Sequence, residues 1–420
     1  MDVLGVDDDL DGALRVHVES RTDQRWCRGC GVRARVKDRA AVTLIDLTCF
    51  GHQVRLVWHK HWWVCPETAC AVGSWTVIDD RIAVSGAGLT DRAGRWATVQ
   101  VGKAGRSVSD VAGELGCDWR TVNDAVVLYG EALLGEDTER TVGVTALGLD
   151  ETVFKREGKW RTLRWATTVA DVGGKGRPSR LVEMVEGRTA AEVSAWIDRQ
   201  PDTWRNEIVW GTLDLSGPYR KVFNNSLGHV RQVADRFHVV KQANGALDEC
   251  RRRVQNETCG HRGRQDDPLF RARRLLTKAH ARLDEKGEAK LVGLLQAGDP
   301  RGEVRMTWHA KEATTGLYDI GDPTLARDYL TALIADMADE AMPVEVQGLA
   351  GTLSRWFDHI VAWHEAQVSN GPTESINNLI KRIKRVGFGF TKFRHYRVRA
   401  LLYAGRPNWD LLATVTPSRD

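Results

Sequence analysis

Two acidic residues stand at the ends of segments that otherwise resemble buried β-strands, and they restrict the folds open to this chain. Asp150 follows the apolar run VTALGL, and Asp214 follows the similar run IVWGTL. An ionised carboxylate on a buried strand is costly unless it is paired or bound to a metal ion. A third acid, Glu374, lies in the first turn of a helix predicted for residues 372–385. The chain therefore needs a fold in which two strand ends and this late helix meet.

The segment that contains Asp150 and Asp214 has the pattern of a mixed α/β sheet. Two hairpin turns come first, and helices and strands then alternate. Strands are predicted at residues 142–152, 160–172, 180–185, 208–213 and 230–234, turns at 155–159 and 173–176, and helices at 189–199 and 218–224. From residue 237 to about 366 strand signals are absent, which predicts an all-helical insertion ahead of the helix of Glu374.

Five of the eight cysteines fall within residues 20–76, where a strand-like alternation covers residues 41–47 and 53–57. Two of them have the two-residue spacing of a zinc knuckle, and a second pair follows with four residues between. Four thiolates can close a tetrahedral structural site, so we predict a small zinc-binding β module. Its ligands are predicted to be Cys27, Cys30, Cys65 and Cys70, with Cys49 and His61 as spare candidates.

Residues 107–127 have the pattern of two short helices separated by Gly116. Ser107 begins the first helix, and Asp118 is a favourable N-cap residue for the second. Such a pair is typical of a helix-turn-helix, whose second helix presents side chains to DNA bases. The residues predicted to face outward are Arg120, Thr121, Asn123 and Asp124. Trp119 is interpreted as a packing residue, with a wedge between bases as the alternative.

Clustered carboxylates repel one another unless a divalent cation neutralises them. Hard oxygen ligands suit Mg²⁺ or Mn²⁺. Two such ions about 3.5–4 Å apart can activate a water and stabilise a leaving 3′ oxygen in phosphodiester cleavage. We therefore predict that Asp150, Asp214 and Glu374 are the catalytic residues and magnesium ligands of a phosphoryl-transfer enzyme. Glu151 alternates to the other face of its strand and is predicted to have a supporting or structural role.

Four motifs make this sequence resemble the ISL3-type insertion-sequence transposases, which are bacterial members of the DDE class. They are GLDE at 148–151, DLSGPY at 214–219, ADRFHVVK at 234–241, and SNGPTESINNLIK at 369–381, which runs on to GFGF at 387–390. The resemblance covers nearly the whole chain, including the cysteine cluster and the helix-turn-helix. It implies a ribonuclease H-like core and places Asp150, Asp214 and Glu374 at the positions of the metal-binding triad.

Asp235 and His238 form an Asp-x-x-His pair just after the last predicted strand. They are either a core histidine with its carboxylate partner or a supporting, DNA-contacting pair beside the triad. Asp235 also competes with Asp214 for the role of the second catalytic acid. We favour Asp214, because it directly ends a strand that is expected beside the first.

The chain around and after Glu374 is basic, with nine Lys or Arg and no Asp or Glu in residues 375–409. On the predicted helix, Asn378, Lys381 and Arg385 share the face of Glu374, and three isoleucines face the core. A scissile phosphate would then lie between metal ions and cations. Loop residues predicted to extend this phosphate-binding surface are Lys392, Arg394, His395, Arg397 and Arg399.

Composition excludes other classes of protein. The sequence has no apolar stretch of about 18 residues, so no membrane span is expected. Its first eleven residues are acidic, unlike a signal peptide, and a cytoplasmic location is expected. Cysteines in that compartment are better interpreted as thiols or metal ligands than as disulfides.

Five regions are predicted: a zinc module at 20–76, a helix-turn-helix region at 77–135, the first part of the core at 142–241, the helical insertion at 242–366, and the last core helix with a basic segment at 367–410. We expect a transposase that cuts double-stranded DNA at terminal inverted repeats and joins the 3′ hydroxyl to target DNA. Two element ends must meet, so a homodimer is expected. The alternatives are a non-catalytic sequence-specific DNA-binding repressor and a metal-dependent structure-selective nuclease.

Overall fold

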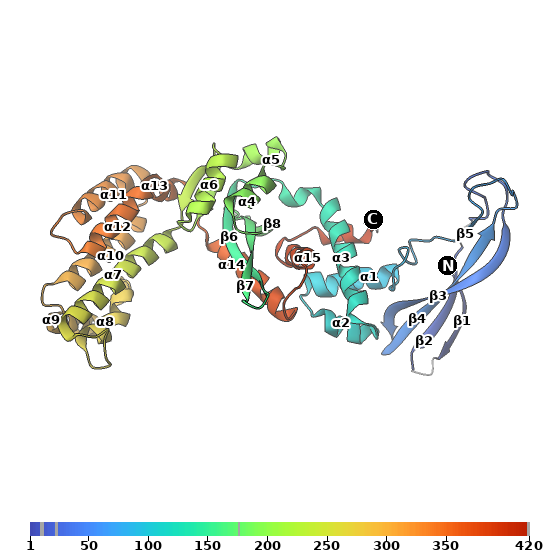
Figure 1. The fold of residues 1–420 in the computed structure, drawn as a ribbon, viewed down its shortest axis with the longest axis horizontal. Coiled ribbons are helices and arrows are strands. Elements are labelled where there is room, and N and C mark those ends of the chain that lie inside the picture. The colour runs from blue at the N-terminus through green and yellow to red at the C-terminus, as the bar shows by residue number, and fades with distance from the viewer. Residues whose placement is uncertain (9–11, 22–23, 175–176, 418–420) are drawn as a thin grey trace.

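A computed structural model describes the whole chain except residues 9–11, 22–23, 175–176 and 418–420. The molecule is elongated, with an N-terminal sheet at one end, a bundle of helices at the other and a mixed sheet between them (Figure 1). The second half of the turn predicted at 173–176 lies outside the described residues. Within the part of the chain that is described, no helix has the length and apolar character needed to cross a bilayer.

The N-terminal sheet has five strands in the order β1-β2-β4-β3, with β5 paired to β4. The strands are β1 (Asp2–Asp8), β2 (Leu14–Glu19), β3 (Arg35–Cys49), β4 (His52–Val64) and β5 (Ser74–Thr76). The strand-like segments at 41–47 and 53–57 lie in β3 and β4, which form one long hairpin. The sheet also includes β1 and β2, which precede the predicted module. A small core of buried residues that includes Val18, Leu44 and Leu56 lies under it.

Three helices follow. They are α1 (Asp91–Thr98), which continues into a π-helical turn η1 (Val99–Lys103), α2 (Val108–Leu115) and α3 (Trp119–Glu136). Helices α2 and α3 begin where the capping residues predict, whereas α3 continues to Glu136, beyond the predicted end at 127. The Ser107 hydroxyl accepts the Asp110 N–H to begin α2, and the Asp118 carboxylate accepts the Thr121 N–H to begin α3. Gly116 ends α2 with a φ of 64°, a left-handed conformation that glycine adopts without strain. The predicted pair of helices is confirmed.

The central sheet has the order β10-β9-β6-β7-β8. Its strands are β6 (Ala146–Glu157), β7 (Thr162–Asp171), β8 (Arg180–Glu186), β9 (Trp210–Leu213) and β10 (Arg231–Ala234). β6, β7 and β8 are antiparallel, whereas β9 runs parallel to both β6 and β10. The predicted mixed sheet is confirmed, but the first hairpin turn lies later than the predicted 155–159. The reason is that residues 155–157 pair with residues 162–164 and lengthen both strands.

Helices cover both faces of this sheet. One face carries α4 (Ala190–Ile197) and α6 (Gly217–Ser226), with α5 (Asp202–Glu207) nearby, and its core includes Leu147, Leu149 and Val169. The other face carries α14 (Gly371–Val386) and α15 (Phe393–Ala404). The core under α14 and α15 continues without a break into α1, α2 and α3. The helices of the predicted helix-turn-helix, α2 and α3, therefore share one hydrophobic core with the central sheet.

The predicted insertion is helical throughout. It comprises α7 (Arg236–Cys259), α8 (Pro268–Thr277), α9 (Glu285–Gly298), α10 (Glu303–Gly316), α11 (Pro323–Met337), α12 (Val344–Arg355) and α13 (Phe357–Ala366). Four short 3-10 helices complete the described structure: η2 (Thr138–Thr141), η3 (His280–Arg282), η4 (Leu317–Asp319) and η5 (Trp409–Ala413). Because α7 leaves from the end of β10 and α13 packs back against β10, the insertion begins and ends beside the sheet (Figure 1).

Candidate active site

Asp150 and Asp214 lie side by side because their strands are neighbours in register. Gly148 of β6 pairs with Thr212 of β9 in the parallel ladder, and each acid follows two residues later. Burial raises the pKa of the Asp214 carboxyl, and the negative charge of Asp150 raises it further. The topology thus brings the two predicted acids together, from strands that are more than 60 residues apart in the sequence.

Glu374 joins this edge of the sheet through the N-terminus of α14. A Cβ atom added to Gly148 would lie 2.1 Å from Thr373 Oγ1, so only glycine lets this turn of α14 rest against β6. The Glu374 side chain is 45% exposed and points toward His238, with 3.8 Å between Oε1 and Nε2. The glycine of the GLDE motif therefore has a packing role, namely to seat the helix that carries the third acid.

The Asp150 carboxylate is held at both oxygens. The Glu151 N–H donates to Oδ1 at 2.7 Å, and the Asn377 side-chain amide donates to Oδ2 at 2.7 Å. The Thr168 hydroxyl donates to the amide oxygen of Asn377 at 2.6 Å, which turns the Asn377 NH₂ group toward Asp150. Thr168 and Asn377 are both buried. Asn377 is not among the site residues predicted from the sequence, although its place one turn after Glu374 on the sheet-facing side of the helix is a usable signal.

Asp235 is engaged as the cap of α7. Its carboxylate accepts the Phe237 N–H at 2.8 Å and the Asn370 N–H at 2.6 Å, and His238 Nδ1 lies 3.4 Å away. Although burial opposes ionisation, hydrogen bonds from His238 and from the Asn370 N–H hold the pKa of Asp235 below its usual range. The hydrogen bond to Asp235 raises the pKa of His238 despite its burial. Asp235 thus fastens the chain just before α14 to the start of α7.

One carboxylate oxygen at this edge of the sheet lacks a hydrogen-bond partner and could bind a cation. Asp214 Oδ1 is buried and has no hydrogen-bond partner, whereas the oxygens of Asp150 and Asp235 are hydrogen-bonded. A buried, unsatisfied carboxylate oxygen is costly, and a hard divalent cation would satisfy it. Among the described residues, however, the only group of three or more possible ligands within 4.8 Å of one another is the set of four cysteines. The three acids are therefore neighbours that are not drawn together as tightly as bound ligands.

The four predicted cysteines form one cluster at the open end of the β3–β4 hairpin, where β3 begins and β4 ends. Cys27 Sγ lies 3.6 Å from Cys70 Sγ, and Cys30 Sγ lies 3.5 Å from Cys65 Sγ. Zinc–sulfur bonds of about 2.3 Å in a tetrahedron require sulfur–sulfur distances of about 3.8 Å, which is close to these values. Backbone N–H groups of Cys30 and Gly29 lower the pKa of Cys27 to about 6, whereas burial raises the pKa of Cys65. The cluster has the chemistry and spacing of a zinc site, and Cys49 and His61 lie outside it.

The predicted recognition helix is α3, and the structure corrects one of its residues. Arg120 is exposed and forms an ion pair with Asp124, and the Thr121 hydroxyl donates to Asp118. Asn123 is buried rather than outward-facing, because α15 packs against α3 and His395 hydrogen-bonds to the Asn123 amide. Asn123 is therefore not available to read DNA bases in this conformation.

The basic face of α14 is arranged as predicted. Asn378, Lys381 and Arg385 are exposed on the side of Glu374. The three predicted core residues of this helix, Ile376, Ile380 and Ile383, are buried.

The basic segment after α14 differs from the predicted surface loop, because Phe393–Ala404 is the helix α15 and half of it packs inward. Lys392 and Arg394 are exposed, and Arg394 pairs with Glu131. Arg397 pairs with the buried Glu183, and Arg399 is itself buried. The prediction that Arg399 extends an exposed surface is wrong, since the helix turns its side chain into the core.

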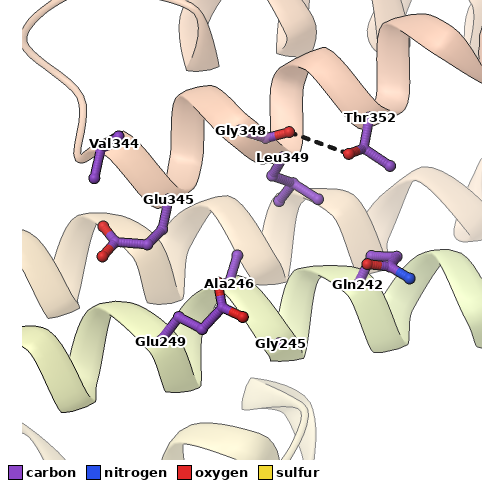
Figure 2. A pocket seen from close by; sticks show the side chains of 9 residues that line it. All are labelled: Gln242, Gly245, Ala246, Glu249, Val344, Glu345, Gly348, Leu349 and Thr352. Atoms are coloured by element: carbon purple, nitrogen blue, oxygen red, sulfur yellow. Dashed lines mark hydrogen bonds between the residues drawn. The ribbon is translucent and has the colours of Figure 1, made fainter.

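A groove on the helical insertion lies apart from these cations. It has a volume of about 460 Å³ and runs between α7 and α12, where Gln242, Ala246, Leu349 and the carboxylates of Glu249 and Glu345 line it (Figure 2). No lysine or arginine is among the described residues that line the groove. Because DNA is a polyanion, this acidic groove does not extend the basic surface of α14.

Comparison with known proteins identifies the family of this chain. A sequence model of a DDE family described as "Transposase" matches residues 147–400, which is more than half of the chain and contains all three acids. The chain belongs to this family, the ISL3-type transposases.

Named relatives fall in the same class. The transposase for insertion sequence element IS1557, found in two strains of Mycobacterium tuberculosis, is 28% identical over 292 residues. That match covers 65% of this chain and 62% of the relative, so the chain spans less than two thirds of it. The transposase for insertion sequence element IS1001 of Bordetella parapertussis is 23% identical over 409 residues, which cover 92% of this chain and 91% of the relative.

Proposed function

We propose that this protein is a transposase that cuts DNA at the ends of an insertion sequence and joins the freed 3′ hydroxyl to target DNA. The observation that carries the proposal is the parallel register of β6 and β9, which sets Asp150 beside Asp214. Two further observations support it: Glu374 approaches the same edge from α14, and the unpartnered Asp214 Oδ1 favours a cation there. The sheet of three antiparallel and two parallel strands, covered on both faces, supports a ribonuclease H-like core.

Mg²⁺ or Mn²⁺ held by Asp150, Asp214 and Glu374 would supply the activation of water and the stabilisation of the leaving 3′ oxygen. The chain's own residues prepare this site. Asn377 and the Glu151 N–H hold Asp150 in one orientation, with a free lone pair left on its oxygens. His238, fixed by Asp235, lies against Glu374 and restrains it. Pre-set carboxylates of this kind lose little freedom when a cation binds, which favours binding.

The exposed cations of α14 would hold the DNA backbone beside the carboxylates. Asn378, Lys381 and Arg385 extend in a row from Glu374, and contacts of this type position a duplex without reading its sequence. Arg120 and Thr121 at the start of α3 are the residues proposed to read the terminal inverted repeats. Zinc held by the four cysteines would organise the N-terminal module, which contacts either DNA or the partner subunit of a homodimer.

The test compares cleavage and binding in the same variants. Asp150→Asn, Asp214→Asn and Glu374→Gln each remove a metal-binding charge and little volume, so each should abolish Mg²⁺-dependent cleavage of inverted-repeat duplexes while leaving DNA binding intact. Glu157→Gln is the matched control, because Glu157 is an exposed acid at the far end of β6 that pairs with Arg164. If Asp214→Asn cleaved DNA at a near-normal rate and Asp235→Asn did not cleave it, the second catalytic acid would be Asp235 and our assignment would be wrong.

The same assay separates the rival functions. Sequence-specific binding without any metal-dependent nicking would identify a repressor. Cleavage of branched DNA without joining of the 3′ end to a target would identify a structure-selective nuclease.

A further inference from the structure

A cavity of about 260 Å³ lies where the helix-turn-helix meets the end of α14. It is bounded by the first turn of α2 and by the segment that connects α14 to α15. Its walls include Ser107, Trp119, Phe388, Phe390, His395 and Arg399, and no acidic side chain is among the described residues that line it. We call it the Arg399 pocket. None of the roles proposed above uses it.

Arg399 is a buried cation without a counter-charge in the described structure. Its side chain is 2% exposed, and neither Nε nor Nη2 has a hydrogen-bond partner. The guanidinium group lies over the ring of Phe390, with 5.7 Å between Cζ and the ring centre, and this cation–π contact stabilises its charge only weakly. Burial lowers the pKa of Arg399 to about 10, so the group is still charged at neutral pH. An unpaired buried charge is expensive, and its presence beside a cavity points to an absent anionic partner.

The two orphaned nitrogens specify the shape of that partner. Nε and Nη2 lie on one edge of the guanidinium plane, the edge that binds two oxygens of a phosphate or carboxylate side by side. The N-terminus of α2 lines the same cavity with Ser107, Val108 and Ser109. The first N–H groups of a helix have no acceptor within it, and they lie at the positive end of the helix dipole. Both features favour a phosphate group.

The rim of the pocket carries exposed aromatic rings. Phe388 is 96% exposed with a φ of 51°, and Trp119 is 50% exposed. Exposed rings beside a phosphate-binding groove are the usual platform for an unpaired base, because every base has a flat face that stacks on them. A fully paired duplex cannot offer such a base, since its bases are stacked inside the helix.

We propose that the Arg399 pocket binds one unpaired nucleotide of the DNA, with its phosphate at Arg399 and the α2 N-terminus and its base on Phe388. This inference rests on the proposed function, because it assumes DNA along α14. A helix rises about 1.5 Å per residue, so Gly387 lies about 20 Å from Glu374 along α14. At about 3.4 Å per nucleotide, the unpaired position lies roughly six nucleotides from the cleavage site. Because Nε and Nη2 are themselves buried, this binding requires a shift of the Phe388 segment, which Gly387 and Gly389 flank.

The experiment uses the full chain and two fluorescent DNA probes of the same sequence. One is a fully paired duplex, and the other has a single unpaired 2-aminopurine, whose emission falls when it stacks on a ring. Phe388→Ala should weaken binding of the second probe by about 5- to 150-fold, the range for one base–aromatic stack, and should abolish the emission change. Binding of the paired duplex should stay unchanged. Phe50→Ala is a matched control, because Phe50 is also 96% exposed with a φ of 50°, lies at the β3–β4 turn and is not among the residues that line the pocket.

Arg399→Met gives a second, independent result. It removes the charge and keeps much of the volume, so it should weaken the unpaired probe and leave the melting temperature unchanged or higher. A lower melting temperature would instead assign Arg399 to the core, and it would overturn the phosphate role.

Equal affinity and emission for Phe388→Ala, Phe50→Ala and the unaltered protein, with the paired duplex still bound and cut, would overturn the pocket alone. If the unaltered protein bound neither probe, the proposed function and this inference would fall together. Competition gives a further check. If a free nucleotide weakens binding of the unpaired probe and inorganic phosphate does not, the pocket recognises the base and the phosphate together.

Discussion

Replacing Asn377 with alanine tests whether the orientation of Asp150 matters for the site. The change removes the donor to Asp150 Oδ2 at 2.7 Å and leaves the buried Thr168 hydroxyl without its acceptor. A hydrogen bond to a charged group contributes about 1.5–3 kcal/mol, and a buried donor left unpaired costs about 1–3 kcal/mol. The two costs concern one small network, so they are not simply additive.

The expected effect on function is larger than the effect on folding. Groups that orient metal ligands typically change metal affinity or activity by about 10- to 100-fold when they are removed. We therefore expect Asn377→Ala to weaken Mn²⁺ binding, measured by calorimetry, and to slow metal-dependent DNA cleavage within that range. Asn378→Ala is the matched control for Mn²⁺ binding, since Asn378 is the next residue on α14 and is exposed. Cleavage is compared with the unaltered protein, because Asn378 lies in the row proposed to hold the DNA backbone.

Thr168→Val completes the test as a double-mutant cycle. It removes the hydroxyl that turns the Asn377 amide, so it should reproduce part of the Asn377→Ala effect. The double variant should lose no more affinity than Asn377→Ala alone, because both changes break the same chain of hydrogen bonds. Equal Mn²⁺ affinities for Asn377→Ala and Asn378→Ala would refute the reasoning.

Three further predictions follow from other parts of the structure. Metal analysis should find one zinc per chain, and Cys65→Ser should eliminate it. The N-terminal sheet should then lose protection from hydrogen exchange, since structural zinc contributes roughly 10 kcal/mol or more of apparent binding energy. Asp46→Asn should weaken the contact of β3 with α1 by about 1.5–3 kcal/mol at neutral pH, because the buried Asp46 accepts hydrogen bonds from Thr90 and Arg92. These bonds hold the pKa of Asp46 below its usual range against the effect of burial. The stability that they add is therefore present above the unfolded pKa of about 3.9 and is lost as the pH falls through the folded pKa. Hydrogen-exchange rates of Asp46→Asn that still differ from those of the unaltered protein at pH values below both pKa values would contradict this prediction. Replacing Lys381 and Arg385 with alanine should weaken binding to specific and random duplexes alike and reduce the slope of log affinity against log salt by about 0.9 for each lost contact, and a change confined to the specific duplex would contradict that role.

Features that depend on residues close together in the sequence could be predicted from it. Ser107, Gly116 and Asp118 predicted both ends of α2 and the start of α3, because caps are local interactions within three or four residues. The spacing of the cysteines predicted the cluster, since each pair sits in one tight turn. Alternation and turns predicted the strands of the central sheet, with errors only at their ends.

The tertiary structure alone decided which distant groups meet. Asn123 satisfied every local rule for an outward position, yet α15, which lies more than 260 residues later, covers it. Arg399 belongs to a strongly basic run, but the packing of α15 on the core buries it and leaves its charge facing a cavity. Asn377 is next to an exposed asparagine and differs from it only in facing Asp150. A side chain's partners depend on how whole elements pack, and that information is spread over segments too far apart in the chain for local patterns to carry it.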